Sequence, residues 1–135
     1  MLEIYNIKAK QEYLKEIAEL TQKEWGNQTD SIEEFNEKIE RKINKIISNL
    51  NNPNYCKLIL LQNNTLVGFI SIFPHDCDER PNLSPWYATM YVKEEFRENG
   101  YSKLLNGAIL KEAKTRGFTK IYLKTDLINY YEKFG

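Results

Sequence analysis

The stretch YVKEEFRENGYSKLL, residues 91–105, decides the fold of this chain. It joins residues 86–92, which have the aromatic and β-branched composition of a strand, to a helical pattern that Gly117 can end as a left-handed cap. A short apolar run, residues 121–123, follows the helix. A strand, a helix long enough to cross a sheet and a second strand predict a right-handed βαβ unit with two parallel strands. The apolar face of the helix is formed by Leu104, Leu105, Ala108 and Ile109.

The connection between this strand and this helix has the composition of a phosphate cradle. Arg97, Gly100 and Ser102 lie where free backbone N–H groups and the positive end of the helix dipole converge, and glycine permits close approach by an anion. The segment is neither a Walker loop nor a GxGxxG fingerprint, because GK[ST] and the paired glycines are absent. The alternative is a simple connection in which Gly100 only completes a turn.

The remaining segments predict helices on both faces of one mixed, mostly antiparallel sheet. A first strand over residues 2–7 precedes an amphipathic helix, and a capping box at Ser31 and Glu34 begins a second helix. Two strands follow as a hairpin around residues 62–65, whose asparagines tolerate positive φ. In chain order, the further segments are an amphipathic helix ending near Trp25, hairpin strands over 55–61 and 66–73, a proline-rich loop over 74–85, and a final helical turn or two over 128–134.

Composition places the chain among soluble proteins with one domain, residues 1–135. Its 19 Lys and Arg balance 19 Asp and Glu, which argues against a nucleic-acid partner. No apolar run approaches the roughly 20 residues that a membrane span requires, and no signal peptide is visible. One histidine and two separated cysteines make a metal site improbable. We therefore expect a cytoplasmic protein without a membrane or metal.

The charge is unevenly divided. Residues 1–90 hold 10 Lys and Arg against 13 Asp and Glu, whereas residues 91–135 hold 9 against 6. The positive part contains the cradle, where Arg97 and Lys103 would meet phosphates. The negative part contains the acidic loop over residues 74–85.

Two motifs together resemble the GCN5-related N-acetyltransferases (GNAT). Arg97, Gly100 and Ser102 fill the fixed positions of the family pattern [Q/R]xxGx[G/A], with serine in place of the usual glycine or alanine. Residues 129–135, NYYEKFG, resemble the family segment FYEKLGF at the expected distance. The resemblance extends over the whole chain and implies the family's acyl-CoA N-acyltransferase fold.

One departure from the family concerns the C-terminus. Family members continue beyond the FYEK segment into further strands, and this sequence stops at Gly135, so the C-terminal strands are expected to be missing. An uncovered edge at residues 122–125 would favour association, and we therefore expect a homodimer.

The resemblance implies acetyl transfer from acetyl-CoA to a primary amine of a small molecule or peptide by direct attack. It implies Val92 as the oxyanion donor, Met90 as the backbone partner of pantetheine, and Tyr131 as the acid that protonates the leaving thiolate. The alternative for Tyr131 is core packing. The full set of residues expected to bind the cofactor is Met90, Tyr91, Val92, Arg97, Glu98, Asn99, Gly100, Tyr101, Ser102 and Lys103.

The acceptor side depends on the loop PHDCDERPNLSPW, residues 74–86, which resembles an HDxxxRPxLxPW loop of one bacterial subgroup. His75 is a candidate base, Asp76 and its acidic neighbours would attract a cationic amine, and Trp25 and Trp86 are candidate pocket walls. Solvated charges, a structural histidine and core tryptophans are the alternatives. Two other functions also remain open, namely a non-catalytic acyl-CoA-binding module and a plain interaction domain.

Overall fold

The computed structural model describes residues 1–26, 30–74, 86–118, 121–124 and 130–133. The strands are β1 (Leu2–Asn6), β2 (Cys56–Gln62), β3 (Thr65–Phe73), β4 (Trp86–Val92), β5 (Ile121–Lys124) and β6 (Tyr130–Lys133). The helices are α1 (Leu14–Trp25), α2 (Ile32–Asn49) and α3 (Tyr101–Thr115), with short 3-10 helices over Ile7–Ala9, Gln11–Tyr13 and Glu94–Phe96. The elements predicted up to residue 124 are present, with small differences in their bounds.

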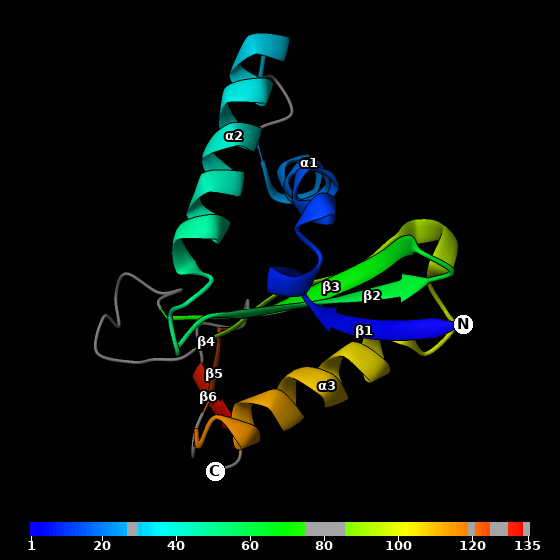
Figure 1. Ribbon diagram of the computed structural model, residues 1–135, viewed down its shortest axis with the longest axis vertical. Helices are drawn as coiled ribbons and strands as arrows, with labels where there is room; N and C mark the ends of the chain where they lie inside the picture. Colours follow the sequence, from blue (N-terminus) through cyan, green and yellow to red (C-terminus); the bar gives the residue numbers. More distant parts are fainter. Residues whose placement is uncertain (27–29, 75–85, 119–120, 125–129, 134–135) are drawn as a thin grey trace.

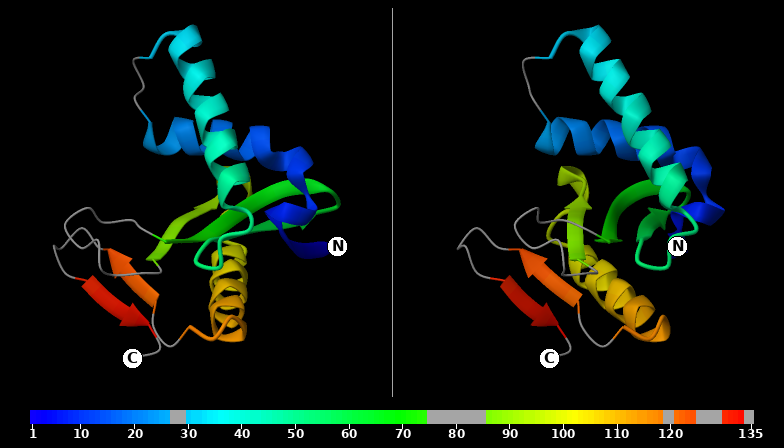
Figure 2. Two further views of the ribbon diagram at one scale, coloured as in Figure 1. Left: turned by 60° about the vertical axis from the view of Figure 1, so that its left-hand side comes forward. Right: turned by 90° about the vertical axis from the view of Figure 1, so that its left-hand side faces the viewer.

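These strands form one sheet in chain order, β1-β2-β3-β4-β5-β6. Neighbouring strands are antiparallel except for β4 and β5, which are parallel and are joined by α3. In Figure 1, α1 and α2 lie above the sheet and α3 lies below it, and Figure 2 shows the same separation from two other sides. The mixed, mostly antiparallel sheet flanked by helices and the parallel βαβ unit are therefore confirmed.

Short-range signals in the sequence correspond to observed turns and caps. Asn63 and Asn64 have φ of 50° and 68° in the β2–β3 hairpin. Gly117, with φ of 84°, donates its N–H to the Lys114 carbonyl at 2.9 Å, and Phe118 donates to the Ala113 carbonyl at 3.0 Å, which is a Schellman motif. No helix within the described ranges is long and apolar enough to cross a membrane.

The core has two layers because the sheet is buried on both faces. The layer under α3 comprises Cys56, Leu58, Leu60, Val67, Ile70, Ile72, Leu105, Ile109 and Ala113. The layer under α1 and α2 comprises Ile7, Leu14, Ile17, Ile46, Tyr55, Ile59, Leu61, Leu66 and Phe69. Leu104, which the helical pattern placed on the buried face of α3, is exposed.

The C-terminal segment differs from its prediction. Residues 130–133 form β6, where the sequence predicted a helical turn, and β6 pairs antiparallel with β5. Tyrosine favours strands, and the β5 edge offers backbone hydrogen bonds that a local helical pattern does not reveal. β6 covers the edge whose exposure was the reason to expect a homodimer, so the structure gives that prediction no support.

Candidate functional site

The backbone at the N-terminus of α3 has the features of an anion-binding site. The N-cap is Gly100, with φ of 77°, and the helix has neither a side-chain cap nor an acidic residue in its first turn. Leu104 donates its N–H to the Gly100 carbonyl at 3.3 Å. Helix geometry leaves the N–H groups of the preceding residues, Tyr101 to Lys103, without intrahelical partners. These donors, together with the helix dipole, suit a phosphate group.

The backbone of Val92 points away from β3. Lys93 donates its N–H to the Val67 carbonyl at 2.9 Å, and Val92 lies opposite Gly68 in the antiparallel ladder. Val92 and Gly68 are therefore a non-hydrogen-bonded pair, in which the N–H and C=O of Val92 face away from β3. Consistent with this, the Val92 carbonyl accepts a hydrogen bond from Arg97 Nε at 2.9 Å. A Cβ on Gly68 would lie 2.4 Å from the Tyr91 carbonyl oxygen, so only glycine permits this close packing.

Among the described residues, no strand pairs with the C-terminal end of β4 on the side that faces away from β3. β5 pairs with β4 at Trp86 and Tyr87, whereas β4 continues to Val92. The β3–β4 register also shifts between Phe69 and Ser71, which places an extra residue in β4 as a β-bulge. In Figure 2, β5 and β6 lie apart from the far end of β4. The divergence leaves room beside Met90, Tyr91 and Val92 for an extended ligand.

A cleft of about 420 Å³ occupies this position. Its described lining is Glu24, Met90, Tyr91, Val92, Phe96, Arg97, Glu98, Gly100, Tyr101 and Ser102. Most residues expected to bind the cofactor therefore lie around one space. Asn99 and Lys103 are outside this lining, and the Asn99 side chain donates to the carbonyls of Phe96 and Arg97. Glu24 and Phe96 were missed by the sequence analysis, because neither belongs to the motif.

The two predicted tryptophans occupy different environments. Trp25, at the end of α1, is 52% exposed, and its ring lies edge-on to that of Tyr91 with centroids 6.2 Å apart. Tyr91 in turn stacks on Phe69. Trp86 is fully buried at the start of β4. Trp25 therefore lies beside the cleft, whereas Trp86 is part of the interior.

The remaining predicted site residues are His75, Asp76 and Tyr131. His75 and Asp76 lie outside the described residues. Tyr131 lies in β6, opposite Leu123 of β5. Its position thus belongs to the pair of strands that diverges from β4, while its proposed role stays a prediction.

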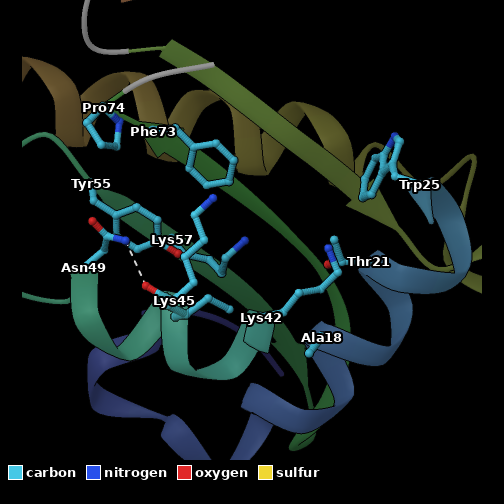
Figure 3. A pocket seen from close by; sticks show the side chains of 11 residues that line it. Ala18, Thr21, Trp25, Lys42, Lys45, Asn49, Tyr55, Lys57, Phe73 and Pro74 are labelled. Atoms are coloured by element: carbon cyan, nitrogen blue, oxygen red, sulfur yellow. Dashed lines mark hydrogen bonds between the residues drawn. The ribbon is translucent and has the colours of Figure 1, made fainter. Parts of the chain in front are cut away.

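A second cavity of about 460 Å³ lies on the α1 and α2 side of the sheet. Figure 3 shows lysines from α2 and β2 together between Tyr55 and Thr21. Trp25 belongs to its lining, whereas the neighbouring residue Glu24 lines the first cleft. The two spaces therefore adjoin the same end of α1. The described lining is Ala18, Thr21, Trp25, Lys42, Lys45, Ile46, Asn49, Tyr55, Lys57, Phe73 and Pro74.

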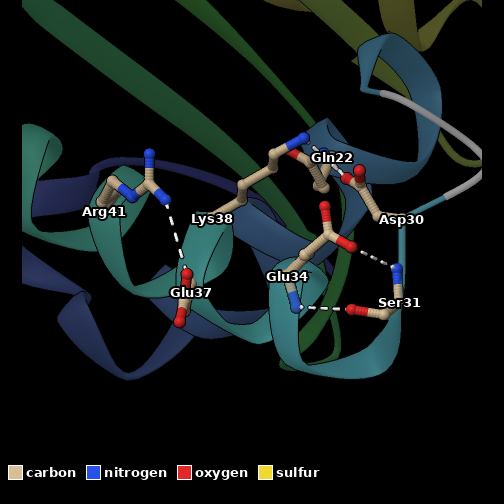
Figure 4. A network of polar contacts seen from close by, with 7 residues as sticks. All are labelled: Gln22, Asp30, Ser31, Glu34, Glu37, Lys38 and Arg41. Carbon is tan, nitrogen blue, oxygen red and sulfur yellow. Dashed lines mark hydrogen bonds and ion pairs between the residues drawn. The ribbon is translucent and has the colours of Figure 1, made fainter.

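A polar network fixes the two helices that bound this cavity (Figure 4). Asp30 accepts from Lys38 Nζ at 2.7 Å and from the buried Gln22 amide at 3.4 Å. Ser31 Oγ accepts from the Glu34 N–H at 3.1 Å, and the Ser31 N–H donates to the Glu34 carboxylate at 3.3 Å, which confirms the capping box. These contacts tie the start of α2 to the last turns of α1, and so help to fix the position of Trp25.

Lys57 is the most unusual residue of the second cavity. Its side chain is buried, at 3% exposure, and Nζ donates to Ser71 Oγ at 2.6 Å and lies 4.9 Å from the centre of the Phe69 ring. Burial is the main cause that lowers its pKa to about 7, and repulsion from Lys42 acts in the same direction, while Cys56 raises it. Sequence analysis missed this residue, although a lysine inside the apolar run CKLILL was a visible signal.

The buried amine makes stability depend on pH. Below pH 7 a charged Lys57 must be buried, whereas an unfolded lysine stays protonated up to about pH 10.4. The wild type should therefore gain roughly 2–3 kcal/mol between pH 6 and pH 9 relative to Lys57→Met, because the unfolded state binds more protons in that window. Urea unfolding at both pH values measures this difference. Lys45→Met, at an exposed position, is the control. It retains Lys57 and should therefore show the same pH dependence as the wild type; equal slopes in all three proteins would contradict the prediction.

Solved structures share this architecture. A predicted acetyltransferase from Clostridium acetobutylicum, solved with acetyl-CoA, is 18% identical with a TM-score of 0.69, over 96% of this chain and 84% of that one. A GNAT-family acetyltransferase from Staphylococcus aureus is 26% identical with a TM-score of 0.63, over 89% and 96%. The PaiA N-acetyltransferase of Thermoplasma acidophilum, in complex with coenzyme A, is 23% identical with a TM-score of 0.62, over 93% and 79%.

The sequence itself matches a family model. No curated protein matches this chain closely enough to count as a relative. The model of the acetyltransferase (GNAT) family, however, matches residues 14–135, which include the cradle, the divergent strands and α1. The chain belongs to the GNAT acetyltransferase family.

Proposed function

We propose that this protein is an N-acetyltransferase that transfers an acetyl group from acetyl-CoA to a primary amine by direct attack. The observation that carries the proposal is the first cleft, in which the outward-facing backbone of Val92 and the uncapped N-terminus of α3 line the same space. Family membership and structurally similar proteins solved with acetyl-CoA or coenzyme A support the choice of donor.

The cleft has features that fit this donor. A Cβ on Gly100 would meet no atom within 4 Å, so the backbone there is open to a ligand. Arg97 and the first-turn N–H groups of α3 provide positive potential for a pyrophosphate, although Glu24 and Glu98 also line the cleft. The free edge of β4 beside Met90 offers backbone groups to an extended pantetheine arm.

In the proposed reaction, acetyl-CoA supplies a thioester carbonyl to the incoming amine. The Val92 N–H stabilises the negative charge that develops on the carbonyl oxygen when the new C–N bond forms. We further propose that Tyr131 gives its proton to the sulfur as the C–S bond breaks, and that His75 removes the ammonium proton of an acceptor attracted by Asp76. The products are an N-acetylated amine and coenzyme A.

Calorimetry with acetyl-CoA and a thiol-release assay over an amine library test the proposal together. Binding with amine-dependent release of coenzyme A would support it. Binding without release for any amine would favour the non-catalytic acyl-CoA-binding module, and absence of binding would leave only an interaction domain. Either of the last two results would refute the proposed activity.

Ser102→Glu should weaken acetyl-CoA binding by about 10-fold, because it places a negative charge at the proposed phosphate site. Ser102 is exposed in the first turn of α3, where glutamate favours the helix dipole, so the fold should tolerate the change. Calorimetry measures the affinity. The control is Asn44→Glu, which adds the same charge at an exposed position of α2 outside either cavity lining. Equal affinities in both variants would place the phosphates elsewhere.

A further inference from the structure

The second cavity is lined by α1, α2, β2 and β3, and the proposed function assigns no role to the charged and apolar side chains of its wall. Lys42, Lys45 and Lys57 contribute to its lining, and the described lining contains no aspartate or glutamate. The rest of the wall is largely aromatic or aliphatic, including Trp25 and Phe73. A cationic cavity with apolar walls favours a ligand that carries both an anionic group and a hydrocarbon portion.

Lys57 is the group in the cavity that a bound anion would stabilise most. Its Nζ has Ser71 Oγ as a neutral partner at 2.6 Å, and no ion pair joins it to a carboxylate of the described residues. Burying a cation without a countercharge costs free energy. Burial, together with repulsion from the nearby Lys42, therefore lowers the pKa of Lys57 to about 7. An anionic oxygen in the cavity would offset this cost and restore the charged form of the amine.

Tyr55 supplies a second buried polar group, whose hydroxyl lacks a hydrogen-bond partner among the described residues. Its side chain is 5% exposed, and its ring stacks on Phe73 with centroids 5.7 Å apart. Tyr55 directly precedes β2 and lies two positions from Lys57, so both belong to the same face of the sheet. In Figure 3 its ring points toward Lys57. A ligand oxygen between them would accept from both groups.

The cavity also lies beside the proposed donor site. Trp25 belongs to its wall and contacts Tyr91, which lines the first cleft, with ring centroids 6.2 Å apart. Glu24, the preceding residue, lines that first cleft. The end of α1 thus borders both spaces, so an amine bound in the cavity would lie next to the cleft.

We propose that the second cavity is the acceptor pocket and that it selects a primary amine carrying an anionic oxygen group, a carboxylate or a phosphate ester, which binds Lys57 and Tyr55. The proposal rests on the acetyltransferase function proposed above and adds the substrate class to it. Lys42 and Lys45 lie on α2 and strengthen the positive potential of the pocket.

Matched amine pairs test this selection in the thiol-release assay. The carboxylate arm compares L-phenylalanine with phenethylamine and 4-aminobutyrate with butylamine, and the phosphate arm compares phosphoethanolamine with ethanolamine. For at least one arm, kcat/KM should be about 10-fold or more higher for the anionic member, the gain expected from one hydrogen bond to a charged group. Equal or higher values for the neutral members in every pair would overturn the proposal.

Variants assign the preference to the cavity. Lys57→Met should bring the ratio within a pair close to one by lowering kcat/KM for the anionic member alone. Lys42→Gln and Lys45→Gln, at less buried positions, should lower the same ratio severalfold and keep the test valid if Lys57→Met does not fold. Arg41→Gln is the matched control, since Arg41 is exposed on α2, lies outside the cavity lining and carries the same charge. A ratio that survives the three lysine variants would refute the assignment.

A binding measurement separates this proposal from the proposed function. In protein labelled with ¹³C-lysine, titration with acetate or inorganic phosphate should raise the pKa of the Lys57 signal, which Lys57→Met identifies. A raised pKa of Lys57 without turnover of any amine would refute the proposed acetyltransferase activity and support the anion site. Turnover without an anionic preference, or an unchanged Lys57 signal with both anions, would refute the anion pocket.

Discussion

Proline in place of Val92 should lower kcat for acetyl transfer by about 10²- to 10³-fold, the usual loss when one oxyanion donor is removed. The substitution deletes the backbone N–H and retains an apolar side chain. Because this N–H faces away from β3, proline removes no bond of the β3–β4 ladder, and Lys93 keeps its hydrogen bond to the Val67 carbonyl. The KM for acetyl-CoA should change little, since the lost interaction forms mainly in the transition state.

Val92→Ala is the matched control for that substitution. It keeps the N–H and removes part of a side chain that packs against the core under α3. We expect kcat within a few-fold of the wild type and a modest loss of stability. Thermal unfolding of both variants checks the fold. If Val92→Pro folds and retains kcat, another group stabilises the oxyanion; if both variants lose kcat equally, the side chain is what matters.

The parts of the fold and site that the sequence predicted depend on local rules. Gly117 adopts the positive φ of the left-handed cap that its place after α3 predicted, and Ser31 and Glu34 form a capping box because their spacing permits it. The cradle is equally local, since α3 begins within the motif, directly after Gly100. Such features require only residues that are close together along the chain, so the sequence pattern was sufficient to predict them.

The features that were missed depend on contacts between distant segments. β6 exists because β5 offers it an edge, and a helical pattern in its own residues gave no hint of that partner. Glu24 enters the first cleft because α1 ends beside Tyr91 of β4. Of the second cavity, Trp25 was predicted as a pocket wall, and Lys57 carried a signal as a charge within an apolar strand. Its meaning depended on α2 bringing Lys42 and Lys45 to the same space.

Tyr131→Phe should lower kcat by about 10²- to 10⁴-fold, the range for loss of a general acid, because the thiolate would then leave without a proton. A thiol pKa of about 8.5 and a phenol pKa of about 10 place donor and leaving group close enough for this transfer. Steady-state kinetics with acetyl-CoA and an accepted amine measure the effect. The KM for acetyl-CoA should stay near that of the wild type, since the phenol is proposed to act on the departing sulfur.

Tyr130→Phe is the matched control for Tyr131, because it removes the same hydroxyl from the neighbouring position of β6, and neighbouring positions of a strand lie on opposite faces of a sheet. Its kcat should remain within a few-fold of the wild type. A role of Tyr131 in packing alone predicts a lowered unfolding midpoint with kcat preserved in the folded fraction. An acid role predicts the opposite, an unchanged midpoint with kcat lost. Equal losses of kcat in both variants would mean that the pairing of β6 with β5, and not one phenol, supports catalysis.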